Sequence, residues 1–244
     1  MKVSRIAELL ERFLGKANDR RLTDADLANI STYIDLLLRW NARINLTAVR
    51  DPEEIVTRHF GESFFAARHL FPTRARVETG DSPVRLGRIR LADVGSGAGF
   101  PGVPIKLWAP EISLTLIESN QKKAVFLREI CRALGLRNLG LRDLGLRDLG
   151  LRDVNIENVR AETVSPAAFD VVTLRAVEHF TDASAVAANL VRPSGRLALL
   201  ISSTQVQSAK SALSKFHWSD ANPIPMSESR LLLIGTKEIG TNEP

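Results

Sequence analysis

The segment from Ile89 to Gly102 restricts the possible folds more than any other part of the chain. An apolar run ends at Asp93, and glycines follow at alternate positions, Gly95, Gly97 and Gly99. Glycine allows positive φ angles and a close approach of the backbone to a ligand, and the start of the following helix offers free N–H groups. A strand, a glycine-rich turn and a helix in this order predict a nucleotide-binding edge of an α/β sheet.

The chain after residue 89 supports this fold class. Short apolar runs alternate with helical patterns, which predicts α/β architecture with a sheet of about seven strands, mostly parallel and covered on both faces. The predicted strands span residues 89–94, 113–118, 154–158, 169–174, 195–201 and 230–236, with a weaker one at 216–220. The predicted helices span residues 102–108, 121–133, 182–191 and 205–214.

The first third of the chain has a helical pattern. Apolar residues recur at helical spacing in the first 14 residues, Thr23 with Asp26 predicts the start of a second helix, and Pro52 suits the first turn of a third. Several prolines and glycines then predict a connecting loop. The expected organisation is an N-terminal helical region at 1–72, a loop at 73–88 and a sheet domain at 89–244.

A pentapeptide repeat interrupts the alternation of strands and helices at 134–153. Leu134-Gly-Leu-Arg-Asn138 is followed by three copies of Leu-Gly-Leu-Arg-Asp. A period of five matches neither a strand nor a helix, so the leucines have no face to bury consistently, and each glycine costs a helix interior about 1 kcal/mol. We expect an insertion in a surface connection, because loop closure depends weakly on length. A recognition arm, or a helical arm buried by self-association, is the alternative.

Composition excludes several classes of protein. The 244 residues are 44% hydrophobic and 25% charged, which is ordinary for a globular chain. The apolar runs are far shorter than the roughly 18 residues that span a membrane, the first 15 residues include acidic side chains, unlike a signal peptide, and the single cysteine, Cys131, excludes an internal disulfide. We expect a cytoplasmic monomer that does not bind membranes.

The net charge of +5 has an uneven distribution along the chain. Much of the excess lies in one arginine-rich stretch, where Glu78 and Asp81 are the acidic residues. A clustered basic stretch attracts phosphate groups, although a solvated connecting segment is an equally good interpretation. The arginines are Arg68, Arg74, Arg76, Arg85, Arg88 and Arg90.

A second carboxylate supports a site for a nucleoside cofactor. The second predicted strand ends at Glu118, where a carboxylate can accept hydrogen bonds from ribose hydroxyls. Asp93, before the glycines, would repel a pyrophosphate but suits the cationic methionine end of S-adenosylmethionine. Gly97-x-Gly99-x-x-Gly102 also fits the dinucleotide pattern. An NAD-dependent oxidoreductase is therefore an alternative, although no second domain large enough for a hydride acceptor follows.

These motifs resemble those of the 16S ribosomal RNA guanine-N7 methyltransferases, also called the glucose-inhibited division protein B family, within the class I S-adenosylmethionine-dependent methyltransferases. The matching pieces are Trp40-Asn-Ala-Arg-Ile-Asn45-Leu-Thr47, Arg58-His59, Asp93 through Pro104, Leu116-Ile-Glu118-Ser119 with Lys122-Lys123 and Phe126-Leu127, Arg160-Ala-Glu162, and Phe169-Asp170 with Arg175-Ala176. Three places depart from the family pattern, and one of them is the pentapeptide repeat, which adds about fifteen residues where the family has a short link. Gly61-Glu-Ser-Phe64 stands where the family usually shows Asp-Ser-Leu, and Ser202-Ser203 replaces a Lys-Gly pair.

The resemblance implies a Rossmann-like methyltransferase sheet that binds S-adenosylmethionine and methylates N7 of a guanine in 16S rRNA of the 30S subunit. Guanine N7 carries a lone pair and no proton, so we expect no general base, and the four histidines show no spacing that suggests a metal site. Arg175 is expected to position the cofactor or the guanine. The predicted cofactor-binding residues are Asp93, Gly95, Gly97, Gly99, Phe100, Glu118, Ala161, Glu162 and Arg175.

A second set of polar residues is predicted to contact RNA. Several of these residues also have a structural interpretation. His59 would be a hydrogen-bonded structural residue, Asn41 and Asn45 would cap a helix, and Lys122 and Lys123 would lie in an exposed first helical turn. The candidates are Asn45, His59, Lys122, Lys123, Arg85 and Arg88. Other possible activities are methylation of a small molecule or a protein, the NAD-dependent oxidation above, and RNA binding without catalysis.

Overall fold

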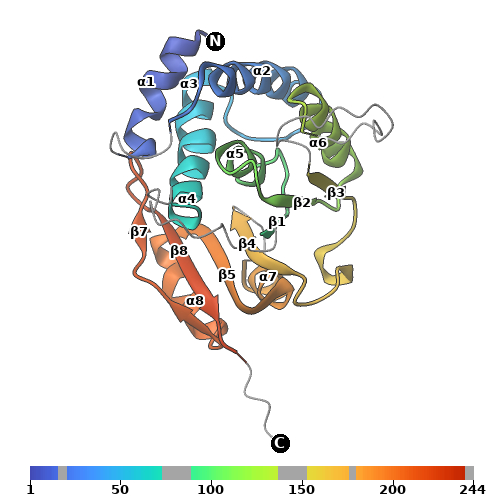
Figure 1. The fold of residues 1–244 in the computed structure, drawn as a ribbon, viewed down its shortest axis with the longest axis vertical. Coiled ribbons are helices and arrows are strands. Elements are labelled where there is room, and N and C mark those ends of the chain that lie inside the picture. Colours follow the sequence, from blue (N-terminus) through green and yellow to red (C-terminus); the bar gives the residue numbers. More distant parts are fainter. Residues whose placement is uncertain (16–20, 73–88, 137–152, 176–179, 240–244) are drawn as a thin grey trace, which may run out of the picture.

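The computed structural model describes residues 1–15, 21–72, 89–136, 153–175 and 180–239. A central sheet carries helices on both faces (Figure 1). The chain begins with α1 (Val3–Leu14), α2 (Asp24–Asn41), and a helical segment formed by α3 (Pro52–Glu54), the π-helical turns of η1 (Ile55–Gly61) and α4 (Glu62–Leu70). Thr23 and Asp26 form the expected capping box at the start of α2.

The sheet has eight strands in the order β3-β2-β1-β4-β5-β8-β6, and the short β7 pairs with β8. The strands are β1 (Arg90–Val94), β2 (Ser113–Ile117), β3 (Val154–Glu157), β4 (Phe169–Arg175), β5 (Val191–Ser202), β6 (Phe216–Trp218), β7 (Asn222–Pro223) and β8 (Arg230–Lys237). Strands β1 to β5 pair in parallel, and β8 is antiparallel to its neighbours. The predicted α/β class with a mostly parallel sheet is confirmed. The sequence pattern missed β7, which has only two residues.

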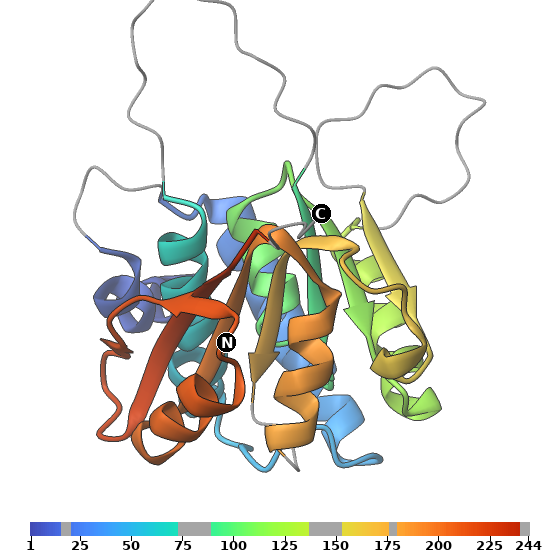
Figure 2. The same cartoon turned by 90° about the horizontal axis from the view of Figure 1, so that it is seen from below.

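The helices that follow the strands complete two layers around the sheet. They are α5 (Gly102–Trp108), α6 (Gln121–Ala133), α7 (Phe180–Leu190) and α8 (Val206–Ala212), with short 3-10 turns η3 (Ala161–Thr163) and η4 (Ser203–Gln205). Figure 2 shows α7 and α8 in front of the sheet and the N-terminal helices behind it. The boundaries of the expected helices at 102–108 and 121–133 agree with α5 and α6.

The N-terminal helices share one hydrophobic core with the sheet. Buried rings of Phe13, Tyr33 and Phe60 belong to the same cluster as Leu91 of β1 and Leu114 of β2. The other face of the sheet has its own cluster under α7 and α8. The helical region thus packs directly on the layer that contains the glycine-rich turn, while the domain boundaries given above remain a prediction.

Strand β1 lies between β2 and β4, so the strand order reverses direction at β1. Ligands of open α/β sheets bind outside the carboxyl ends of strands at such a switch point. The glycine-rich turn after Val94 is at this end. Ile89 and Asp153 are the first described residues after the segments 73–88 and 137–152. They directly precede β1 and β3, so they lie at the amino ends of these strands, opposite the glycine-rich turn.

The first copy of the pentapeptide repeat forms the end of α6. Gly135 has a φ of +65°, and the N–H groups of Gly135 and Leu136 donate to the carbonyls of Arg132 and Cys131 at 3.1 and 2.7 Å. This pattern is a Schellman cap. Both leucines, Leu134 and Leu136, are buried. The expectation that the repeat has no face to bury is therefore wrong for Leu134 and Leu136 of its first copy. The chain reverses at Gly135, so the leucine before it and the leucine after it both enter the core.

Candidate cofactor site

The turn after β1 adopts the strained conformations that its glycines allow. The φ angles of Gly95, Gly97 and Gly99 are +66°, +56° and +88°, which side chains other than hydrogen rarely permit. The N–H groups of Gly95 and Ser96 donate to the carbonyl of Ile117 at 2.9 and 3.1 Å and thereby attach the turn to the end of β2. The turn is held in a defined position above the switch point.

Asp93 supports the turn from below. Its side chain is fully buried; Oδ2 accepts from the Gly102 N–H at 3.1 Å and Oδ1 accepts from the Thr173 hydroxyl at 2.8 Å. Burial raises the pKa of Asp93 to about 6, and the hydrogen bonds limit the rise. A Cβ atom at Gly102 would lie 2.8 Å from Oδ2, so glycine is required for this contact. Direct contact of Asp93 with a ligand remains a prediction.

Glu118 holds the turn from the side. Its Oε2 accepts from the Gly97 N–H at 2.8 Å, and its Oε1 accepts from the Asn120 N–H at 2.7 Å. Asn120 in turn begins α6 by accepting from the N–H groups of Lys122 and Lys123. Each carboxylate oxygen can accept a second hydrogen bond, so Glu118 keeps capacity for the predicted ribose hydroxyls.

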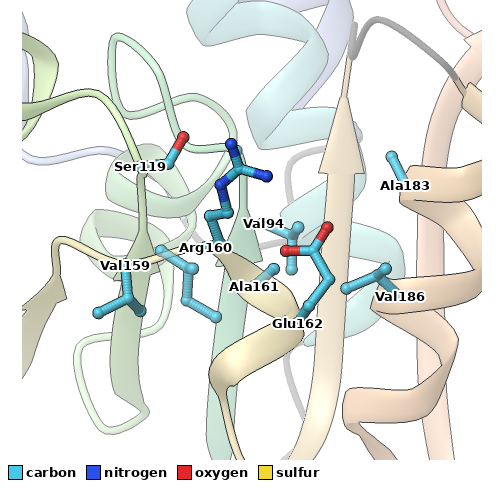
Figure 3. A pocket seen from close by; sticks show the side chains of 10 residues that line it. Val94, Ser119, Val159, Arg160, Ala161, Glu162, Ala183 and Val186 are labelled. Atoms are coloured by element: carbon cyan, nitrogen blue, oxygen red, sulfur yellow. The ribbon is translucent and has the colours of Figure 1, made fainter.

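A cavity of about 270 Å³ opens at the carboxyl ends of β1 and β2. This volume is near the lower limit of roughly 300 Å³ for small-molecule sites. Its lining comes from β1, β2, the segment after β3, and α7 (Figure 3). The lining residues are Val94, Gly95, Ile117, Ser119, Val159, Arg160, Ala161, Glu162, Ala183 and Val186. Gly95, Ala161 and Glu162 are residues predicted from the sequence, whereas Arg160 is not, although it lies in the same Arg-Ala-Glu motif.

The side chains that line this cavity fit S-adenosylmethionine. Aliphatic side chains of the two strands and of α7 offer an apolar slot for a flat base. In Figure 3, the guanidinium of Arg160 and the carboxylate of Glu162 extend toward the same side of the cavity, with the guanidinium drawn beside Ser119. An apolar slot with a few polar groups at one side suits an adenosine, whose ribose hydroxyls require acceptors.

The ring of Phe100 points into the core and does not line this cavity. It stacks on Tyr33, with ring centroids 5.2 Å apart, and on His59 at 4.9 Å, while Phe60 meets it edge-on. A cofactor contact of Phe100 would therefore involve its backbone. The aromatic cluster joins the glycine-rich turn to α2 and η1 of the helical region.

Arg175, at the carboxyl end of β4, lies in a buried hydrogen-bonded group. Its Nη2 lies 2.7 Å from the carbonyl oxygen of Arg58, 3.1 Å from Nδ1 of His59 and 2.9 Å from Oε2 of Glu62, so its two hydrogens are shared among three acceptors. Both oxygens of Glu62 also accept from Nη1 of Arg230, each at 2.8 Å. Burial lowers the pKa of Arg175, whereas the charges of Glu62 and Asp93 raise it. Glu62 and Arg230 are not among the site residues predicted from the sequence.

His59 is neutral in this group. Burial, and then the positive charge of Arg175, lower its pKa to about 3. Because a guanidinium only donates, Nδ1 of His59 accepts, and its Nε2–H donates to the Thr47 hydroxyl oxygen at 2.8 Å. Both ring nitrogens are thus used within the protein. This geometry favours the structural interpretation of His59 over contact with RNA.

The other predicted RNA-contact residues have different surroundings. Asn45 and Lys122 are exposed, and Lys123 is half-buried at the start of α6. Asn41, four residues before Asn45, shapes the loop after α2: its side chain donates to the Thr47 carbonyl at 2.8 Å and accepts from the Leu46 N–H at 2.9 Å. Arg85 and Arg88 lie outside the described residues, so their roles stay predictions.

Within the described ranges, every helix is too short or too polar to span a lipid bilayer. Among the same residues, no group of three or more histidine, cysteine or carboxylate side chains has an arrangement that could hold a metal ion.

Comparison with known proteins assigns the chain to a family. The GidB family profile, described as rRNA small subunit methyltransferase G, matches residues 26–229. The ribosomal RNA small subunit methyltransferase G of Xanthomonas campestris pv. campestris (strain B100) is 38% identical over 175 residues, 71% of this chain and 68% of the relative. That of Xanthomonas axonopodis pv. citri (strain 306) is 36% identical over 192 residues, 79% of this chain and 75% of the relative.

Solved structures support the fold separately. The crystal structure of ribosomal protein L11 methylase from Lactobacillus delbrueckii subsp. bulgaricus superposes with a TM-score of 0.52 at 13% identity, and the match covers 75% of this chain and 79% of that one. This likeness confirms the Rossmann-like methyltransferase fold and nothing finer. Since the family profile spans both the helical region and the sheet, the chain belongs to the GidB family, rRNA small subunit methyltransferase G.

Proposed function

We propose that this chain transfers a methyl group from S-adenosylmethionine to N7 of a guanine in 16S rRNA. The observation that carries the proposal is the cavity at the switch point of the sheet, beside a glycine-rich turn braced by Asp93 and Glu118, in a chain of this family. When bound, the cofactor supplies a methyl group on a positively charged sulfur.

The residues around the cavity have distinct proposed roles. Val94, Ile117 and Ala161 would hold the adenine, while the carboxylates of Glu118 and Glu162 would accept hydrogen bonds from the ribose. Arg175, fixed at the end of β4, would bind the negatively charged carboxylate of the cofactor or position the guanine.

The reaction places few demands on proton transfer. Guanine N7 attacks with a lone pair and loses no proton, so alignment of the reacting groups is the main contribution required. The state of His59, which is hydrogen-bonded to Arg175, is consistent with a reaction that needs no general base. His59 is buried, neutral and hydrogen-bonded on both nitrogens, and therefore does not act as a base. The role of the protein is to hold the base and the cofactor together and to exclude water.

Polar residues at the same end of the sheet would contact the RNA backbone. Lys122 and Lys123 lie in the first turn of α6, shortly after the carboxyl end of β2, and Asn45 lies on the loop that Asn41 shapes. Lysine side chains commonly position proteins on phosphates without reading sequence. We further propose that the partner is 16S rRNA, either naked or in the 30S subunit, and that the protein acts as a monomer in the cytoplasm.

Two measurements test this function. Calorimetry with S-adenosylhomocysteine and with NAD identifies the cofactor class, and transfer of labelled methyl groups to 30S particles, naked 16S rRNA and small-molecule pools identifies the substrate. We expect binding of S-adenosylhomocysteine and label at a guanine N7 in 30S particles. Binding of NAD instead, or labelling of small molecules or proteins without RNA, would overturn the proposal.

A matched pair of variants tests the site itself. Glu118→Gln removes one negative charge from the group that holds the turn, and we expect affinity for S-adenosylhomocysteine to fall about tenfold, equivalent to 1.4 kcal/mol. Glu157→Gln, at the end of the neighbouring β3, is the control, because the Glu157 carboxylate accepts from Asn155 of its own strand, whereas that of Glu118 accepts from Gly97 of the turn. Equal affinities of the two variants would remove Glu118 from the site.

A further inference from the structure

One carboxylate links the helical region to two strands of the sheet. Glu62 begins α4, Arg175 ends β4 and Arg230 begins β8, and these residues are 113 and 168 positions away from Glu62 in sequence. The side chain of Glu62 is only 4% exposed and that of Arg175 only 7%. A carboxylate so buried must be paired to be tolerated, and here two guanidinium groups share it.

Within the described residues, the hydrogen bonds of Arg175 leave one of its nitrogens without an acceptor. Its Nε and Nη2 are engaged by Glu62, by His59 and by the carbonyl of Arg58. A guanidinium has five donor hydrogens, and no acceptor within the described ranges takes the two on Nη1. Arg175 lies at the carboxyl end of β4, where the charge of Asp93 also influences it.

We infer that Glu62 is a positioning residue: together with Arg230, it orients the guanidinium of Arg175 so that Nη1 is left to bind the anionic carboxylate of the methyl donor. This inference rests on the proposed function. Arg175 is unable to rotate away without breaking hydrogen bonds to Glu62, His59 and Arg58 at once. A pre-oriented donor loses less freedom when the ligand binds, which increases affinity.

The backbone that carries Glu62 is closely packed. Gly61 ends η1 directly before Glu62, and a Cβ atom at Gly61 would lie 2.7 Å from the ring of Phe13 on α1. The close packing of α1 on η1 thereby fixes the backbone from which Glu62 extends.

Calorimetry with S-adenosylhomocysteine tests the inference in folded protein, well below the melting temperature. We expect Glu62→Gln to weaken binding at least tenfold and Glu62→Asp to recover affinity to within about threefold of the unmodified chain. Glu53→Gln is the control, because Glu53 pairs with Arg5 on the surface of the same helical segment. Affinity of Glu62→Gln equal to that of the control would overturn the inference.

A double-variant cycle separates positioning from general support of the fold. If Glu62 acts through Arg175, the double variant Glu62→Gln/Arg175→Gln binds no more weakly than Arg175→Gln alone, whereas independent effects would add. Additive losses would assign Glu62 a merely structural role. Failure of the unmodified chain to bind S-adenosylhomocysteine would contradict the proposed function. Binding by the unmodified chain with no effect of Glu62→Gln would contradict only the positioning role of Glu62.

A charge-balanced variant covers the case in which Glu62→Gln does not fold. Glu62→Gln/Arg230→Gln removes one negative and one positive charge, so the net charge of the buried group is unchanged while Arg175 loses its carboxylate. We expect this variant to show the same loss of affinity as Glu62→Gln. Affinity within twofold of the unmodified chain would contradict the positioning role.

Discussion

The hydroxyl of Tyr33 donates a hydrogen bond of 2.5 Å to the carbonyl oxygen of Ala98, across 65 positions of sequence. Tyr33 is fully buried on α2, and Ala98 lies in the glycine-rich turn. Burial raises the pKa of Tyr33 well above its usual value, so the hydroxyl remains a donor. Its ring also stacks on Phe100. The N-terminal helix α2 therefore holds the glycine-rich turn through Tyr33.

We predict that Tyr33→Phe weakens both the fold and the site. The variant leaves the buried carbonyl of Ala98 without its donor, which costs about 1–3 kcal/mol in the free energy of unfolding. We expect affinity for S-adenosylhomocysteine to fall several-fold, as measured by calorimetry. Ser31→Ala is the control, because this hydroxyl of the same helix donates to the carbonyl of Met1, away from the turn. Unchanged affinity would mean that the hydrogen bond stabilises the core without shaping the site.

Gly99 is predicted to tolerate no side chain. Its φ is +88°, and a Cβ atom would collide with the hydroxyl of Tyr33 and lie 3.1 Å from Val103. Gly135 has a similar φ of +65° but nothing within 4 Å of its Cβ position. Backbone strain alone gives Gly135→Ala a loss of about 1 kcal/mol in unfolding free energy, and we expect Gly99→Ala to lose clearly more. Denaturant titration of both variants measures the difference, and equal losses would show that crowding at Gly99 is relieved.

The local features of this fold could be predicted from the sequence because they depend on neighbouring residues. The apolar runs of β1 and β2, the capping pair Thr23 and Asp26, and the glycines of the turn all act over a few positions. The turn also identified the binding edge, since strand, glycines and helix occur in one segment. The carboxyl end of β2 followed from the position of Glu118.

The contacts that join distant segments could not be predicted in this way. Glu62 looked like a departure from a family motif, and its partners Arg175 and Arg230 lie on other elements. The hydrogen bond from Tyr33 to Ala98 could not be predicted either, because helical periodicity reports burial and gives no information on the partner of a hydroxyl. One signal was available: Glu62 is a carboxylate in a segment otherwise rich in phenylalanine, and buried carboxylates require cationic partners.

The buried neutral state of His59 makes the fold sensitive to acid. A histidine in the unfolded chain takes up a proton near pH 6.5, whereas folded His59 does so only near pH 3. Because the unfolded state binds more protons between these values, the stabilisation is complete above pH 6.5 and is lost as the pH falls. At pH 4 the loss amounts to about 3 kcal/mol.

We therefore predict a shallower acid dependence for His59→Gln than for the unmodified chain, measured as unfolding free energy from pH 7.5 to pH 4. Comparison with the variant is needed because Asp93, whose pKa is raised to about 6, acts in the opposite direction over part of this range. His217→Gln is the control, because the His217 side chain is 80% exposed. Parallel pH curves for His59→Gln and the unmodified chain would contradict the assignment of a neutral, buried ring.

Two copies of the pentapeptide repeat are predicted to be dispensable. Leu134, Gly135 and Leu136 end α6, and the carbonyl of Asp153 accepts from the Leu114 N–H at 2.8 Å. Deletion of residues 143–152 keeps these four residues and shortens the connection between Leu136 and Asp153 from 16 residues to six. The shorter connection lowers the entropy cost of closure, which raises the unfolding free energy by about 1 kcal/mol.

The same deletion tests whether the repeat takes part in function. Leu136 and Asp153 lie at the amino ends of the strands, opposite the cofactor cavity, so we expect affinity for S-adenosylhomocysteine within twofold of the full chain. Leu136→Ala is the contrast, because removing this fully buried leucine of the first copy costs about 2–5 kcal/mol. A deletion that abolishes transfer to 30S particles while cofactor binding persists would instead assign the repeat to substrate recognition, and a change in oligomeric state would assign it to self-association.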